Sequence, residues 1–167
     1  YYYPTLSGVA QSYNYYPISY MKREEGIAFT ALGLGRMIVE GGQVLRFSPQ
    51  YPNLLPQFHS IKSTIVNSQN SFYALKLNNG INPLMEGENN NLEKLELKEA
   101  ESHGVLKHLA SVVCDEDKMI RDSLSNKGKR VITMAPVLKY DTFPLSELIT
   151  DILKNGKKAM GCPVEAE

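Results

Sequence analysis

The chain has few cysteines, no excess of either charge and no long apolar run. Its 167 residues include only Cys114 and Cys162, too few for a disulfide framework and at no zinc-binding spacing, so we expect two reduced thiols. No apolar run approaches the length of a transmembrane helix, and no charged-then-apolar leader opens the sequence. These absences predict a soluble cytoplasmic protein with no membrane partner.

The charge balance argues against a nucleic-acid partner. Lys plus Arg and Asp plus Glu each number 18, so the net charge is zero and no overall basic field exists to attract a polyanion. The length suits one domain, which would bury roughly 70% of the surface that the unfolded chain exposes. A substantial hydrophobic core is therefore expected.

The first half of the chain predicts short strands separated by turns and loops. Seven tyrosines within the first twenty residues favour strands interrupted at Pro4 and Pro17 over an aromatic binding platform. An apolar run that enters a Gly-x-Gly turn occupies residues 27–35, and a strand after a Gly-Gly turn occupies residues 43–47. They are followed by a proline-rich loop (48–56), an alternating strand (70–77) and an exposed Asn- and Gly-rich excursion (78–91).

The second half mixes helices and strands. The leucines of 92–102 suit either a strand or a helix, and residues 104–113 predict a helix. Residues 129–138 are rich in β-branched side chains and predict a buried strand that ends at Pro136. An apolar stripe then predicts a helix from Pro144 to Gly156, followed by a final strand. Because strands and helices do not alternate regularly, we expect an α+β fold.

Three motifs occur along the chain in a recognisable order. They are "SGVAQSYN" (residues 7–14), "IAFTALGLGRMIVEGGQV" (27–44) and "GCPVEAE" (161–167). Together they span nearly the whole chain. In content and order they resemble the nucleotide-binding, ATP-grasp part of the phosphoenolpyruvate synthase and pyruvate phosphate dikinase family.

The resemblance implies a fold, a larger parent protein and a set of site residues. Residues 1–167 would form a partial ATP-grasp-like domain, mostly antiparallel sheet with packed helices, excised from a multidomain enzyme. The closing strand would offer Glu165 and Glu167 as ligands of the Mg²⁺ that bridges the phosphates of ATP. Alternate residues of a strand share a face, so two oxygen ligands can converge on one cation. Without the resemblance, these are two terminal acids in solvent.

The glycine motif would shape the nucleotide cleft through Gly33, Gly35, Arg36 and Glu40. Arg36 stands where the family usually has Glu, and a cation cannot ligate Mg²⁺. It would instead contact a phosphate or pair with Glu40 four residues on. For Gly33 and Gly35 we favour a tight corner between a strand and a helix over a binding role.

The intact protein would be a transferase, a kinase that uses ATP and Mg²⁺ to phosphorylate a histidine on another domain, which then delivers the phosphoryl group to pyruvate. No catalytic residue is assigned within this chain, which we expect to be inactive without the remainder of its polypeptide. Because of Arg36, a degenerate ATP-grasp-like binding or regulatory module is the alternative. An unrelated α+β interaction domain is a third possibility.

Other candidates for chemistry are weaker. His59, His103 and His108 are scattered, and the last two are spaced five apart rather than the four that suits a helical metal pair. Neither cysteine has a histidine arranged for nucleophilic catalysis, and the sequence contains no P-loop and no serine nucleophile elbow.

Overall fold

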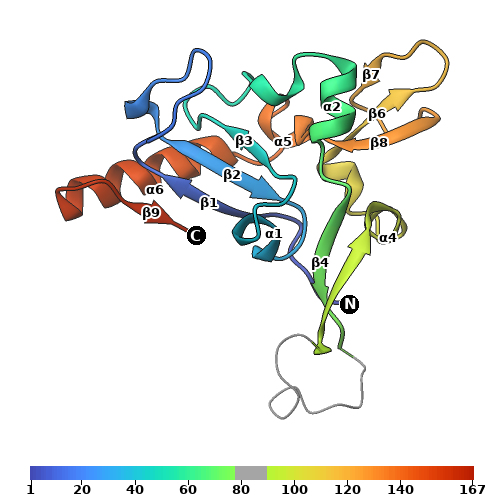
Figure 1. Ribbon diagram of the computed structural model, residues 1–167, viewed down its shortest axis with the longest axis horizontal. Coiled ribbons are helices and arrows are strands. Elements are labelled where there is room, and N and C mark those ends of the chain that lie inside the picture. The colour runs from blue at the N-terminus through green and yellow to red at the C-terminus, as the bar shows by residue number, and fades with distance from the viewer. Residues whose placement is uncertain (78–89) are drawn as a thin grey trace.

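Three antiparallel sheets and a small number of helices make up the part of the chain that the computed structural model describes, residues 1–77 and 90–167 (Figure 1). This mixture confirms the α+β expectation. Within the same residues, no helix is both long and apolar enough to cross a membrane. Both cysteines are free thiols, Cys114 buried and Cys162 exposed.

The largest sheet has the strand order β3-β2-β1-β9, and every neighbouring pair is antiparallel. It joins the two ends of the sequence, since its outer strand β9 comes from the last residues. Its strands are β1 (Ser7–Gln11), β2 (Ile27–Ala31), β3 (Leu45–Phe47) and β9 (Glu165–Ala166).

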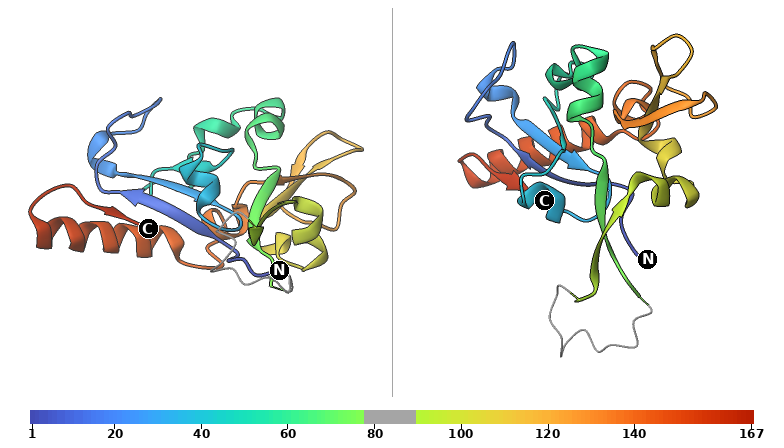
Figure 2. Two further views of the ribbon diagram at one scale, coloured as in Figure 1. Left: turned by 60° about the horizontal axis from the view of Figure 1, so that its bottom comes forward. Right: turned by 45° about the vertical axis from the view of Figure 1, so that its right-hand side comes forward.

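One long helix, α6 (Leu145–Met160), covers one face of this sheet (Figure 2, left). Its buried Leu153 joins the same hydrophobic core as Ala10 of β1. The predicted end of the helix at Gly156 is wrong, because the helix continues to Met160 and stops before Gly161, whose φ of 68° favours glycine. Gly156 serves a packing role: a Cβ there would lie 3.1 Å from a methyl carbon of Val164. The missing side chain lets the segment that leads into β9 fold back against α6.

The second sheet is a ribbon of β4 (Ser71–Leu75) and β5 (Leu92–Glu96), and β5 leads directly into α4 (Leu97–Ser102). Of residues 92–102, for which either a strand or a helix was predicted, the first five form a strand and the last six form a helix. The predicted excursion at 78–91 lies almost entirely outside the described residues.

The third sheet has the order β7-β6-β8, with β6 (Ala110–Cys114) between β7 (Ile120–Arg121) and β8 (Gly128–Ile132). The helix predicted for residues 104–113 is wrong. Only one 3₁₀ turn, η4 (Leu106–His108), precedes β6, whose five residues are all buried and pair with strands on both sides. The strand predicted to reach Pro136 ends at Ile132, and Pro136 lies in the first turn of α5 (Ala135–Leu138), where its missing N–H costs nothing.

Short helices complete the described structure. They are the α-helices α1 (Arg36–Val39) and α2 (Ile61–Asn67) and the 3₁₀ helices η1 (Arg23–Glu25) and η2 (Pro56–Phe58). Figure 1 places α1 beside β2 and β4, so the glycine motif that contains it connects the largest sheet to the β4–β5 ribbon.

Candidate functional site

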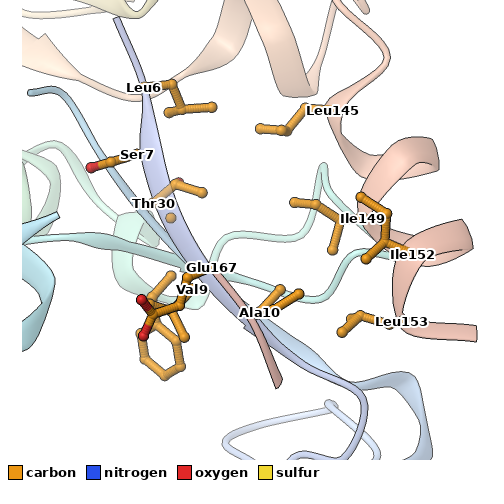
Figure 3. A pocket seen from close by; sticks show the side chains of 13 residues that line it. Leu6, Ser7, Val9, Ala10, Thr30, Leu145, Ile149, Ile152, Leu153 and Glu167 are labelled. Atoms are coloured by element: carbon orange, nitrogen blue, oxygen red, sulfur yellow. The ribbon is translucent and has the colours of Figure 1, made fainter. Parts of the chain in front are cut away.

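Glu165 and Glu167 project from the same side of the final strand, away from α6. Glu165 pairs with Gln11 across the β1–β9 ladder and Ala166 pairs with Ala10, whose side chain belongs to the core under α6. Because side chains alternate along a strand, the two acids take the opposite face from Ala166. Figure 3 shows Glu167 on the side of β1 opposite Leu145 and Ile149 of α6.

The backbone spacing of Glu165 and Glu167 allows both carboxylates to reach one cation. Residues two apart on a strand are separated by about 6.6 to 6.8 Å along the backbone, which flexible glutamate side chains can close around one ion. The amide nitrogen of Gln11 donates to Glu165 Oε2 at 2.5 Å, which orients that side chain on the open face of the sheet. No local sequence pattern marks Gln11 as the partner of Glu165.

The same face of the sheet carries apolar and cationic groups beside the acids. Val9 and Phe29 are half-buried cross-strand partners, and Phe29 is paired in turn with Arg46 of β3. Glu167 lies next to Val9 and lines a cavity with Val9 and Phe29 (Figure 3). The face therefore runs from two carboxylates at the β9 edge, over an apolar middle, to a guanidinium on β3.

A buried hydroxyl on this side of β1 lacks a partner. Among the described residues, the Ser7 Oγ is inaccessible to solvent and makes no hydrogen bond. In Figure 3 the Ser7 side chain points to the same side of β1 as Glu167. Because a buried polar atom without a partner costs free energy, this hydroxyl is a place where a further polar group would be stabilising.

Gly33 and Gly35 have different local environments. Gly33 has a φ of 86°, and a Cβ there would lie 2.7 Å from the carbonyl oxygen of Tyr73 and 2.9 Å from the Phe72 side chain. Glycine is thus required so that the corner after β2 can pack against β4. Gly35 precedes α1 and would place a Cβ in open space. The geometry of Gly33 agrees with the favoured structural role.

Arg36 and Glu40 form an ion pair that extends to Tyr73. Arg36 Nε lies 2.6 Å from Glu40 Oε1, and the Tyr73 hydroxyl donates to Glu40 Oε2 at 2.6 Å. The Arg36 guanidinium also lies 5.5 Å from the centre of the Tyr73 ring. The hydrogen bonds from Tyr73 and then Arg36 hold the pKa of Glu40 below its ordinary value. The ion pair with Glu40, one of the two roles expected for Arg36, is therefore present in the structure.

The end of the glycine motif, rather than Gly33 or Gly35, reaches the acid-bearing face. Gly41 and Gly42 line a cleft of about 380 Å³ together with Phe29 and Arg46. Gly42 packs tightly on Met37, where a Cβ would lie 2.3 Å from the sulfur. The motif and the acids therefore border the same face of the sheet, with Phe29 between them.

The residues present fit Mg²⁺ as a partial ligand set. Within residues 1–77 and 90–167, no three His, Cys, Asp or Glu side chains gather closely enough to hold a metal by themselves. Mg²⁺ in nucleotide sites is usually held by one or two carboxylates, with phosphate oxygens and waters as the other ligands. A pair such as Glu165 and Glu167 meets that need only when a phosphate ligand arrives with the ion.

The cavity that Glu167 lines with Val9 and Phe29 extends around the open edge of β1 to α6 as an apolar groove. Strand β9 pairs with only Ala10 and Gln11, so no described strand lies beside β1 at its Ser7–Val9 edge. The whole cavity has a volume of about 220 Å³, and between this edge and α6 it is lined by Leu6, Leu145, Ile149 and other apolar side chains (Figure 3). Its apolar lining beside an unpaired strand edge suits an additional strand in line with β9.

Four residues of this face were not predicted from the sequence: Val9, Gln11, Phe29 and Arg46. The period of two was sufficient to find Gln11, because Ser7, Val9 and Gln11 alternate along one strand. Phe29 and Arg46 could not be assigned to the face without the pairing register of β2 with β1 and β3.

A scan against protein-family models, a search of curated proteins and a search of solved structures each return no significant match to this chain.

Proposed function

We propose that this chain is a partial ATP-grasp-like domain of a phosphotransferase similar to phosphoenolpyruvate synthase, in which Glu165 and Glu167 bind the Mg²⁺ that accompanies ATP. The observation that carries the proposal is the placement of both acids on one open face of an antiparallel sheet, beside an apolar surface and a guanidinium. The order of the three sequence motifs supports the same assignment.

Each part of the face has a role in the proposal. Glu165, oriented by Gln11, and Glu167 would ligate the ion. Bound there with ATP, Mg²⁺ would neutralise negative charge on the phosphoryl group being transferred. Val9 and Phe29 would exclude water from the nucleotide, and Arg46 offers a cation for an anionic group at the far end. The rest of the enzyme would supply the histidine acceptor and the site for pyruvate.

The open edge of β1 supports the view that these residues act within a larger polypeptide. A further strand beside Ser7–Val9 would fill the apolar groove and extend the face that carries the acids. In the family that the sequence resembles, such a returning strand brings a glutamine ligand. We therefore expect these 167 residues alone to bind ATP weakly or not at all.

The alternative is a degenerate ATP-grasp-like module that binds or regulates without catalysis. The observation that favours it is the Arg36–Glu40–Tyr73 cluster, which commits Arg36 to an ion pair at the position where the family usually has Glu. In that case the face could still bind a ligand, but no phosphoryl group would be transferred to a histidine.

Calorimetry on a longer polypeptide tests the leading proposal. With the preceding half of the domain and the following strand added, we expect ATP binding that requires Mg²⁺ and is lost in the Glu165→Gln, Glu167→Gln double variant. A matched control is Glu147→Gln, Asp151→Asn, which neutralises two exposed acids one turn apart on α6.

Absence of ATP binding in the longer polypeptide, or binding that is indifferent to Glu165 and Glu167, would refute a working nucleotide site at this face. Binding that depends on both acids, with no acid-labile phosphohistidine formed when the domain that carries the histidine is also supplied, would favour the degenerate module.

A further inference from the structure

A second cleft lies at the other end of the molecule, between α2, α5 and the β7-β6-β8 sheet (Figure 1). Its volume of about 500 Å³ falls within the range of about 300 to 1,000 Å³ that is common for small-molecule sites. Its apolar lining residues include Leu55, Phe58, Ile120 and Leu138. Its polar lining residues include Asp122, Thr133 and Lys139.

The polar lining residues belong to an ordered network that ends on Asp122. Ser111 Oγ donates to Asp122 Oδ1 at 2.8 Å, and Ser111 is wholly buried. Since that bond uses the only hydroxyl proton of Ser111, the 2.5 Å contact between Ser111 and Thr133 must be a donation from Thr133. Thr133 Oγ1 then faces the cleft as an acceptor and already receives the N–H of Ala135 at 3.3 Å.

Two further donors hold the other oxygen of Asp122. Lys139 Nζ lies 2.8 Å from Asp122 Oδ2, and the Tyr140 hydroxyl donates to the same atom at 3.0 Å. Burial by itself raises the pKa of Asp122, but the hydrogen bonds from Lys139, Ser111 and Tyr140 outweigh it, and the net shift is downward. Asp122 is thus a carboxylate at neutral pH, with a cation fixed beside it.

Both charged groups keep capacity for a ligand. A carboxylate has about four acceptor positions, of which these contacts use three. An ammonium group has three N–H donors, and the side chain of Lys139 is 57% exposed, against 17% for Asp122. The cleft therefore offers an acceptor at its base and a donor at its rim, together with apolar lining residues.

The backbone beside Thr133 is held in an unusual conformation. Met134, between Thr133 and Ala135, has a φ of 54° although it is not glycine, and its side chain is fully buried. Such conformations cost free energy and are retained where the surrounding structure imposes them. Here the αL residue turns the chain from β8 into α5, which aims Thr133 and Lys139 at the same cleft.

We propose that this cleft binds a free α-amino acid with an apolar side chain, whose ammonium group is received by Asp122 and Thr133 and whose carboxylate is received by Lys139. A simple anion bound to Lys139 would lie close to the Asp122 carboxylate, which would repel it. A simple cation bound to Asp122 would in the same way be repelled by Lys139. A zwitterion matches both charges, and its side chain lies against Leu55 and Phe58. The inference goes beyond the proposed function and does not depend on it.

The test is a titration of the protein with L-leucine and L-phenylalanine, followed by saturation-transfer NMR and calorimetry. Two half-ligands, 3-methylbutylamine and 4-methylpentanoate, carry the leucine side chain with only one charge each. Because each charge-assisted hydrogen bond contributes about tenfold or more in affinity, we expect each half-ligand to bind at least about tenfold more weakly than leucine.

The Lys139→Met variant should make leucine bind no better than 3-methylbutylamine, because the group that distinguishes them is gone. Lys139 is exposed, so the variant should fold, and Lys158→Met on α6 is the matched control that should leave leucine binding unchanged. Three results would each overturn the proposal: no saturable binding of leucine, equal affinity for leucine and its two half-ligands, or leucine binding that is unchanged in Lys139→Met.

Discussion

Two regions of the molecule place carboxylates at the ends of strands, and they differ in how fully those carboxylates are satisfied. Asp122, at the third sheet, accepts hydrogen bonds from Ser111, Lys139 and Tyr140 and is 17% exposed. Glu165, at the edge of the largest sheet, is exposed and accepts one hydrogen bond from Gln11. A carboxylate whose partners are already in place contributes to folding, whereas one on an open face is available to a cation from outside.

The largest expected effect is the loss of Asp122. In Asp122→Ala the buried hydroxyl of Ser111, the hydroxyl of Tyr140 and the ammonium of Lys139 lose their common acceptor, which should cost about 2 to 4 kcal/mol in the free energy of unfolding. Urea unfolding followed by circular dichroism measures it. Asp151→Ala, at an exposed position of α6, should change the same quantity by no more than about 0.5 kcal/mol. Equal effects of the two variants would remove the distinction between the regions.

A smaller loss should follow from Gly156→Val, which tests how the acid-bearing strand is held. The new side chain would overlap Val164, so the segment before β9 must move, at a cost of about 1 to 3 kcal/mol. Asn155→Val, at the neighbouring exposed position, introduces the same side chain without the overlap, and it should change stability little because asparagine and valine have about the same helix propensity. If both variants lose the same stability in urea, Gly156 is not needed for packing β9.

The pH dependence should separate the Asp122–Lys139 pair from the sheet edge. The folded-state pKa of Asp122 is lowered from 3.8, so its contribution is complete above that pH and is lost as the pH falls below it. Hydrogen bonds to Asp122 and Tyr140 raise the pKa of Lys139 from 10.5 to about 12, so its contribution is lost only as the pH rises through that interval.

The stability difference between the unaltered protein and Lys139→Met should therefore stay constant from about pH 5 to about pH 9 and narrow in acid. Urea titrations at several pH values measure it. A difference that instead grows below pH 3.8 would contradict the pairing.

The smallest effect on stability is expected at the candidate metal ligands. Glu165→Gln and Glu167→Gln should each change the free energy of unfolding by no more than about 0.5 kcal/mol, because both side chains are exposed. Thermal unfolding is sufficient to detect a larger loss. A loss of several kcal/mol would assign these acids a structural role and weaken the proposed ligand role.

Local patterns predicted those parts of the fold whose signal is contained in a single segment. The strands at 71–75 and 45–47 and the apolar stripe of α6 follow from periodicity and turn residues. The strand β6 was missed because its identity depends on pairing with residues 120–121 and 128–132, which a local pattern does not contain. The helical stop assigned to Gly156 failed for the same reason, since the partner of that glycine is Val164.

The same distinction between local signals and contacts made by folding applies to the candidate site. A period of two predicts that Glu165 and Glu167 share one face. The cross-strand register that adds Phe29 and Arg46, and the contact of Tyr73 with Glu40, required the fold.

The most direct test of the central claim uses Mn²⁺ as a paramagnetic probe of the Mg²⁺ site. Amide signals of the isotope-labelled longer polypeptide, with the preceding half of the domain and the following strand added, are followed by NMR as Mn²⁺ is added in the presence of ATP. We expect broadening centred on residues 165–167 and on Gln11, absent in the Glu165→Gln, Glu167→Gln variant and unchanged in the Glu147→Gln, Asp151→Asn control. Broadening that is no greater at residues 165–167 than at the α6 acids, or that persists in the double variant, would contradict the account.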